Sequence, residues 1–275
     1  MERNFVKKTI VVLILTVGLA FNAFSANAFT STKNLTKSQE TTVKKVFSAI
    51  ASSNVTKIEN ARKLTLTNSN ADLFLKLVFN HHTTSEIFKS TDGYGNVSPR
   101  VQDLPGKYKY SKNTITLDAN YNLIDGVYSN FKFSKSGKLI SWTVKNGTSA
   151  NSNLNSSIYT FNSTYTNLGV KIPGGIVYSN PNGLTVFQLE YINEHSGFKS
   201  WSYTTGHYRA ADGNAYLIST EPFGCVKSGV TVYLEATTSA KPILASKTTS
   251  VVVAPTYIGC VGGTLSTSSI PITLN

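Results

Sequence analysis

The chain has 275 residues, which allows one large or two ordinary domains. A hydrophobic content of 40% and an aromatic content of 11% can fill a packed core, which excludes a disordered polymer. Only 15% of the residues are charged. Most of the uncharged polar residues are Ser, Thr and Asn, which are typical of strand surfaces and turns rather than exposed helices.

The first 28 residues have the pattern of a signal peptide. A positively charged start precedes a nearly continuous apolar run at residues 10–21. Ala26 and Ala28 offer small side chains to a signal peptidase, so we expect cleavage before Phe29. The alternative is a segment retained as a membrane anchor, but the apolar run is short for a spanning helix. With no cysteine near the cleavage site and no hydrophobic tail, lipoprotein and sortase-type anchoring are not expected.

The charge of the chain favours anionic partners. The formal net charge is +12, and removal of the signal segment leaves +10 for a secreted, extracellular chain. Such a surplus attracts wall polymers, lipid headgroups or nucleic acid. Because the lysines are scattered and no basic stripe with stacking aromatics is visible, a dedicated nucleic-acid binder is disfavoured. The expected partner is an anionic wall polymer, a glycan or a surface protein, held outside the cell without a stable membrane span.

Three helices are predicted near the N-terminus. Apolar residues recur at helical spacing over residues 35–50, and residues 55–63 fit a second helix with Ser53 or Asn54 as its cap. A third helix has Asn70 as its cap and an apolar stripe that ends at the pair His81–His82, which we interpret as helix-end residues.

A small antiparallel sheet follows a loop at residues 92–106. We expect one strand over residues 107–117, then a hairpin whose turn ends at Gly137. Its arms are expected over residues 127–133 and 138–144. The helices and this sheet make an α+β domain over residues 29–145, and residues 146–157 are the predicted linker, because they are polar and lack periodicity.

Residues 158–275 are predicted to form an immunoglobulin-like β-sandwich. About seven short strands are separated by turn residues, including Asp212-Gly213 as a hairpin turn. The expected strands lie within residues 169–179, 184–194, 197–209, 214–220, 229–238, 243–247 and 250–253. The fold class predicted for the whole chain is therefore α+β, mainly β.

Several segments resemble those of known secreted proteins. LEYINEHSG and GVTVYLEATTSAKPILASKTTSVVVAP resemble strands of bacterial immunoglobulin-like or fibronectin-type modules. YSNFKFSKSGKLISWTVKNG is similar to a segment of secreted actinobacterial two-part proteins of unknown function. The resemblance implies export and architecture, and it implies no catalytic residue. Both cysteines follow Trp201, so the Cys–Trp–Cys order of antibody domains is absent.

Two cysteines in an exported chain most simply form one disulfide. Closing the segment between Cys225 and Cys260 would stabilise the fold by roughly 3–4 kcal/mol on the chain-entropy model. No metal site is expected, because two isolated thiols lack a C-x-x-C pair and a nearby histidine.

No catalytic constellation is visible in the sequence. His195 follows Glu194 in what we interpret as a surface turn, and His207 fits a packing position on a strand. A G-x-S-x-G motif and a closely spaced carboxylate pair are both absent, which disfavours a serine hydrolase and a glycosidase. Asp92 is the one carboxylate in a segment that faintly resembles a calcium loop, so a plain loop is expected there. No cofactor is expected.

Tyrosines cluster in the second part of the chain and suggest a binding surface. Exposed strand tyrosines can stack sugars or contact a protein, although half-buried packing is the commoner role. The candidate surface consists of Tyr191, Trp201, Tyr203, Tyr208 and Tyr216.

The sequence thus favours a secreted, non-enzymatic extracellular or cell-surface binding protein. One alternative is an extracellular hydrolase with an unrecognised site in the groove between the two parts. A second is a structural envelope component held by its basic charge.

Overall fold

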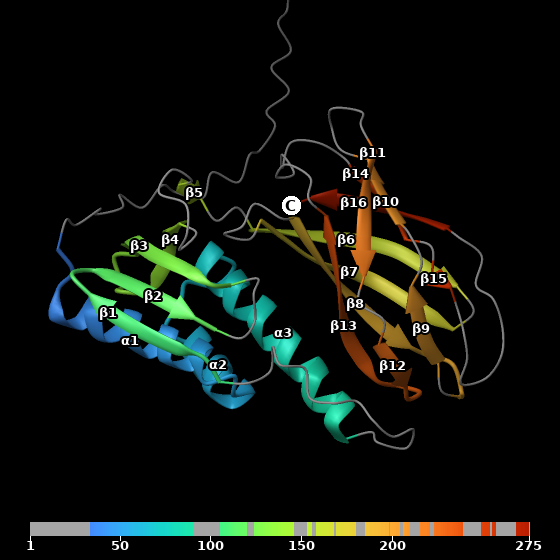
Figure 1. The fold of residues 1–275 in the computed structure, drawn as a ribbon, viewed down its shortest axis with the longest axis horizontal. Helices are drawn as coiled ribbons and strands as arrows, with labels where there is room; N and C mark the ends of the chain where they lie inside the picture. Colours follow the sequence, from blue (N-terminus) through green and yellow to red (C-terminus); the bar gives the residue numbers. More distant parts are fainter. Residues whose placement is uncertain are drawn as a thin grey trace, which may run out of the picture.

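The computed structural model contains three helices and sixteen strands among the residues that it describes (Figure 1). These residues are 34–90, 105–119, 124–145, 153–155, 158–167, 169–179, 185–197, 199–203, 206–209, 215–220, 223–238, 249–253, 255–256 and 268–274. The predicted signal peptide lies outside them, as does the segment with Asp92 and Arg100 and the strand predicted at residues 243–247.

The first two helices begin where polar side chains can cap them. Helix α1 (Lys37–Ala51) starts after Thr36, whose hydroxyl accepts from the backbone N–H of Gln39 while the Gln39 side chain accepts from the N–H of Thr36. Helix α2 (Val55–Arg62) starts after Asn54, whose Oδ1 accepts from the N–H of Lys57 at 2.9 Å. Both predicted helices are confirmed to within two residues at each end.

The third helix is longer than its sequence pattern indicates. Helix α3 spans Asn70–Ser90, so His81 and His82 lie in its interior and not at its end. Both histidines are 3% exposed, because the helix continues across the second part of the molecule. The interpretation of this pair as helix-end residues is therefore wrong. A two-turn apolar stripe did not reveal the remaining turns, because their buried side chains are polar.

The first sheet has the order β1-β2-β3-β4-β5, with every neighbouring pair antiparallel. The predicted strand over residues 107–117 is instead two strands, because Lys112 and Asn113 both adopt positive φ and turn the chain back. The predicted hairpin is confirmed, with Gly137 at φ +79° in its turn. The bounds are β1 (Lys107–Ser111), β2 (Thr114–Asp118), β3 (Gly126–Phe133), β4 (Leu139–Lys145) and β5 (Asn153–Asn155).

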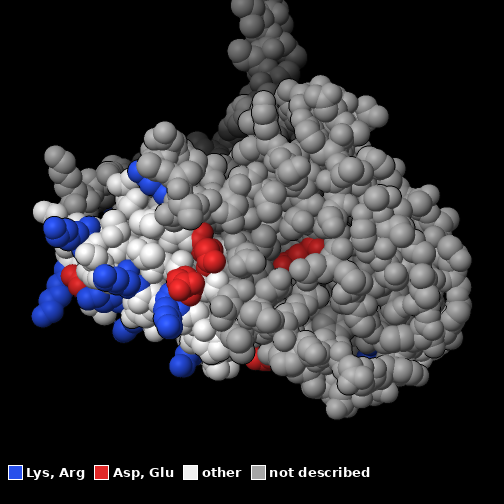
Figure 2. All heavy atoms as spheres, in the orientation of Figure 1, with Lys and Arg blue, Asp and Glu red and all other residues white. Residues whose placement is uncertain are grey.

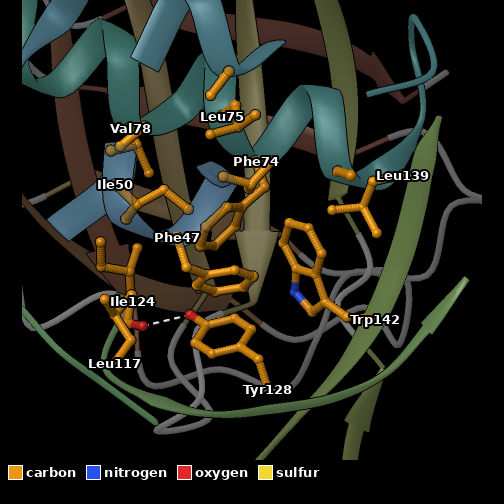
Figure 3. Packing of buried hydrophobic residues seen from close by; sticks show 14 of the residues in the cluster. Phe47, Ile50, Phe74, Leu75, Val78, Leu117, Ile124, Tyr128, Leu139 and Trp142 are labelled. Carbon is orange, nitrogen blue, oxygen red and sulfur yellow. Dashed lines mark hydrogen bonds between the residues drawn. The ribbon is translucent and has the colours of Figure 1, made fainter. Parts of the chain in front are cut away.

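Aromatic side chains from α1, α3 and the first sheet form the centre of the core (Figure 3). The ring of Phe47 lies 4.8 Å from that of Tyr128 and 5.5 Å from that of Trp142, and Phe74 closes the cluster at 5.1 Å from Trp142. The buried hydroxyl of Tyr128 donates to the carbonyl of Ile124, as the dashed line in Figure 3 shows. The apolar faces predicted for the helices and the hairpin therefore meet each other.

Eight strands of the second part close into a barrel. Their order is β10-β11-β13-β8-β7-β6-β16-β14, and the pairing of β14 with β10 completes the ring. All neighbours are antiparallel. The bounds are β6 (Ile158–Asn167), β7 (Val170–Ser179), β8 (Thr185–Asn193), β10 (Gly206–Arg209), β11 (Ala215–Thr220), β13 (Thr231–Thr238), β14 (Thr249–Val253) and β16 (Ser268–Leu274).

This closed pairing bears on the predicted fold class. The chain is α+β and mainly β, as expected, with three helices and antiparallel sheets. An immunoglobulin-like sandwich has two separate facing sheets, so that finer prediction is not confirmed by a ring in which each strand pairs with the next. A short sheet of order β12-β9-β15 completes this part, with β9 (Lys199–Tyr203), β12 (Phe223–Val226) and β15 (Pro255–Thr256).

Helix α3 lies between the first sheet and the barrel and contacts both (Figure 1). Phe74 on this helix packs 5.6 Å from Tyr178 of β7, and Ile158 and Ile176 join the same buried cluster. The hydrophobic core of the first part therefore extends onto the outer face of β6 and β7. The boundaries 29–145 and 158–275 remain a prediction, and the described piece of the predicted linker, β5, pairs with β4.

Candidate functional site

Lysines from two helices line a groove on the outer side of the first part. The groove has a volume of about 600 Å³ and lies between α1, α2 and β1. Lys45 of α1 and Lys57 of α2 are both exposed. Tyr108 of β1, with 37% of its surface exposed, adds an aromatic ring to the same groove. In Figure 2, Lys and Arg side chains lie on the described face of the first part, together with some Asp and Glu side chains.

A third lysine in this basic groove is already partnered. The Nζ of Lys44 donates to Oε1 of Glu40, one helical turn earlier, and lies 4.5 Å from the centre of the Tyr110 ring. The hydrogen bond to the Glu40 carboxylate raises the pKa of the Lys44 ammonium, and desolvation opposes this effect. Lys45 and Lys57 therefore carry the charge that remains available to an anion.

A second region of interest is a buried polar network between α3 and the barrel. Gln188 of β8 is completely buried, and its Nε2 donates to the carbonyl of Leu77 at 2.8 Å and to Oε1 of Glu235 at 3.1 Å. Its Oε1 accepts from Nδ2 of Asn80 at 2.8 Å. The amide of Gln188 thus uses both donor hydrogens and its acceptor.

The same network extends to a histidine. Oε2 of Glu235 lies 3.1 Å from Nδ1 of His81, and the side chain of Glu235 is 11% exposed. Close by, the hydroxyl of Thr84 accepts from the backbone N–H of Tyr233 at 2.8 Å. These contacts attach the second half of α3 to β8 and β13, where burial strengthens each hydrogen bond and makes its loss costly.

A cleft opens beside this network, between α3 and the outer face of the barrel. Its volume is about 350 Å³. Helix α3 contributes one wall and the strands β6, β7, β8 and β13 contribute the other. The polar side chains that line the cleft are Lys76, Asn80, Thr160, Asn162, Glu190 and Tyr233.

The strands bend at the level of this cleft. The register between β6 and β7 shifts between Asn162 and Tyr165, and that between β7 and β8 shifts between Lys171 and Gly175. Such bulges re-aim side chains and are frequent at barrel rims and binding sites. Gly175 is required there, because a Cβ atom would lie 2.0 Å from the carbonyl oxygen of Gln188.

The predicted tyrosine surface is corrected at one position. Tyr191 is 0% exposed, because it alternates with Gln188 and Glu190 on β8 and so faces the barrel interior. It therefore cannot belong to a binding surface. Burial also raises its pKa, and the Tyr165 hydroxyl adds to this effect. For Trp201, Tyr203, Tyr208 and Tyr216 the structure describes the backbone strands and not the side chains, so their surface role stays a prediction.

The remaining predicted residues are placed as follows. In the loop that follows β8, the backbone N–H of Gly197 donates to Nδ1 of His195 at 3.0 Å. Oε1 of Glu194 lies 3.9 Å from Nζ of Lys171. Glu194 and His195 thus have separate partners, as expected of a surface turn. Cys225 has its backbone in β12, while its side chain and the whole of Cys260 lie outside the described residues.

Comparisons with known proteins assign no family to the chain. No family model, curated protein or solved structure matches it. Over the described ranges, no helix is long and apolar enough to cross a membrane. Within the same part of the chain, no group of three His, Cys, Asp or Glu side chains could hold a metal ion.

Sequence reasoning missed the residues of the cleft and the polar network. The alternation of Gln188 and Glu190 with Phe187, Leu189 and Tyr191 in the sequence predicts a polar face on a half-buried strand, but Gln188 is completely buried. It did not reveal that a helix covers that face. One usable signal was the polar run Asn80–Ser85, which follows an apolar helical stripe with no helix-breaking residue between them.

Proposed function

We propose that this chain is an extracellular binding protein for an anionic polymer, which it holds in the basic groove between α1, α2 and β1. The observation that carries the proposal is the convergence of Lys45, Lys57 and the exposed ring of Tyr108 on one groove. Ammonium groups attract phosphate or carboxylate groups, and an exposed aromatic ring adds a stacking surface. A secreted location and a non-enzymatic role belong to the proposal, which does not require an immunoglobulin-like architecture.

The test compares two pairs of charge reversals with the same change in net charge. The double variant Lys45→Glu/Lys57→Glu changes the groove, and Lys132→Glu/Lys135→Glu changes exposed lysines on β3 and its hairpin turn. Binding to poly(glycerol phosphate) and to polygalacturonate is measured by calorimetry at low and moderate salt. We expect the groove variant to lose most of its affinity and the hairpin variant to keep most of it, with weaker binding at higher salt.

Equal losses in the two variants would show that net charge acts without the groove, and would overturn the proposal. Absence of binding to both polymers at low salt would do the same. Tyr108→Leu is expected to weaken binding without any change in charge. Shortening of the polymer during incubation would instead favour the hydrolase alternative, because a binding protein leaves the polymer length unchanged.

A further inference from the structure

The cleft between α3 and the barrel has the composition of a site for a small polar molecule. Its volume of about 350 Å³ is at the small end of the range for ligand pockets, about 300–1,000 Å³. It is separate from the basic groove, because no residue lines both. The proposal below therefore does not depend on the proposed function.

The charges in the cleft balance each other. Lys76 on α3 supplies one positive charge, and Glu190 on β8 supplies one negative charge. A cleft with one charge of each sign has no net preference for an anion or a cation. The remaining polar groups are the amides of Asn80 and Asn162 and the hydroxyls of Thr160 and Tyr233, each of which can both donate and accept.

The donor on the helix side is held in place before any ligand arrives. Asn80 is 3% exposed, and its Nδ2 donates to the completely buried amide of Gln188 at 2.8 Å. Gln188 is fixed in turn by Leu77 and Glu235. An amide oriented in this way loses little conformational freedom on binding, which improves affinity.

The strand side combines a carboxylate, an aromatic ring and the backbone of a glycine. Tyr233 pairs with Glu190 in the register of β13 and β8, so both side chains project from the same face. Both are partly exposed. Gly174 pairs with Asn162 across β7 and β6 and lines the cleft with its backbone, because a Cβ atom there would lie 2.2 Å from the carbonyl oxygen of Phe161.

We propose that this cleft binds a small neutral saccharide of one or two sugar units. Each hydroxyl group of a sugar can both donate and accept a hydrogen bond. Neighbouring sugar hydroxyls therefore complement a carboxylate and two amides better than an ion does. The apolar face of a sugar ring can stack on Tyr233. Balanced charge disfavours phosphorylated and acidic sugars.

The experiment is calorimetric titration of the purified full chain with N-acetylglucosamine, its β-1,4-linked dimer, maltose and cellobiose. Glycine, lysine and inorganic phosphate are titrated in parallel. We expect saturable binding of at least one saccharide. We expect no binding of glycine, lysine or inorganic phosphate. Failure of all four saccharides to bind, or binding of an amino acid or phosphate in their place, overturns the proposal.

Two carboxylate substitutions locate the binding. Glu190→Gln is expected to weaken saccharide binding by about tenfold or more, because a neutral amide replaces the charged acceptor of the hydrogen bonds. Glu194→Gln, four residues further along and 51% exposed beside Lys171, should leave it unchanged. Asn162→Ala, at an exposed edge of the cleft, gives a second reading if Glu190→Gln alters the thermal unfolding of the protein.

The variants also separate this site from the basic groove. Glu190→Gln should keep polymer binding, and Lys45→Glu/Lys57→Glu should keep saccharide binding. Equal saccharide affinity in Glu190→Gln, Asn162→Ala and the unchanged protein would place binding elsewhere and overturn the proposal.

Discussion

Two carboxylates near the first sheet differ in how fully hydrogen bonds and ion pairs compensate their negative charges. Asp72, 4% exposed, accepts from Nε of Arg62 at 3.0 Å and from the N–H of Asn68 at 3.1 Å, so its charge is compensated where α3 begins. Asp125 has one such bond, from the N–H of Ala119 at 2.6 Å. Burial raises the pKa of Asp125, the neighbouring Asp118 carboxylate adds to this, and the bond from Ala119 opposes it.

The raised pKa of Asp125 predicts a dependence of stability on pH. Because the folded state holds the proton more tightly than the unfolded state, this residue lowers the free energy of unfolding as pH rises from the unfolded pKa of about 3.9 through the raised folded value. Asp125→Asn removes this dependence, and the amide oxygen can still accept from Ala119. Urea unfolding at low and at neutral pH should show the variant gaining stability relative to the unchanged protein as pH rises. A difference between the two proteins that stays constant with pH would contradict this.

Helix α3 is the element that unites the molecule. Its first half contributes Phe74 to the aromatic core, and its second half places Asn80 and His81 against β8 and β13. The strand face beneath it changes along the same direction. Apolar Tyr178 and Val186 lie opposite each other at one level, and Gln188 and Glu235 lie opposite each other at the next. Helix α3 is apolar at Phe74, where it faces the first pair, and polar at Asn80, where it faces the second pair.

At the scale of this element, we predict that Gln188→Leu destabilises the protein by about 2–4 kcal/mol. Leucine fills a similar volume, but Asn80, Glu235 and the carbonyl of Leu77 lose their shared partner. Chemical unfolding measures the change. The matched control is Glu194→Leu, where an exposed contact of 3.9 Å to Lys171 is lost and the expected change is within about 0.5 kcal/mol. Equal changes in the two variants would show that the network contributes nothing to stability.

At the scale of the whole molecule, an α+β part and a closed barrel meet along α3 and offer two separate recesses. The basic groove belongs to the first part alone. The cleft exists only because α3 lies on the barrel, so its two walls come from residues at least 80 positions apart in the chain. Charge and polarity differ between them, which supports two different ligands.

The predicted disulfide is a property of the whole chain. We expect Cys225 and Cys260 to resist alkylation in the exported protein until a reductant is added, with an intact mass two hydrogens below that of the reduced chain. Cys225→Ser and Cys260→Ser should each cost roughly 3–4 kcal/mol of stability on the chain-entropy model. Alkylation of both thiols without reductant would disprove the bond.

Local patterns were sufficient for much of the fold. The helical spacing over residues 35–50, the cap at Asn54 and the hairpin turn at Gly137 are short-range signals, because each depends on neighbours within a few residues. They correctly predicted α1, α2 and the hairpin. The order of the predicted helices and strands also indicated an α+β, mainly β chain.

Only the tertiary structure decided which faces are covered. Ring closure depends on β14 meeting β10, and no local pattern encodes a pairing between strands some 40 residues apart. Likewise Gln188 and His81 have the sequence appearance of exposed residues, and they are buried because α3 and β13 approach each other from distant parts of the chain. The cleft follows from that approach, since its polar walls become one site only when the helix lies across the barrel.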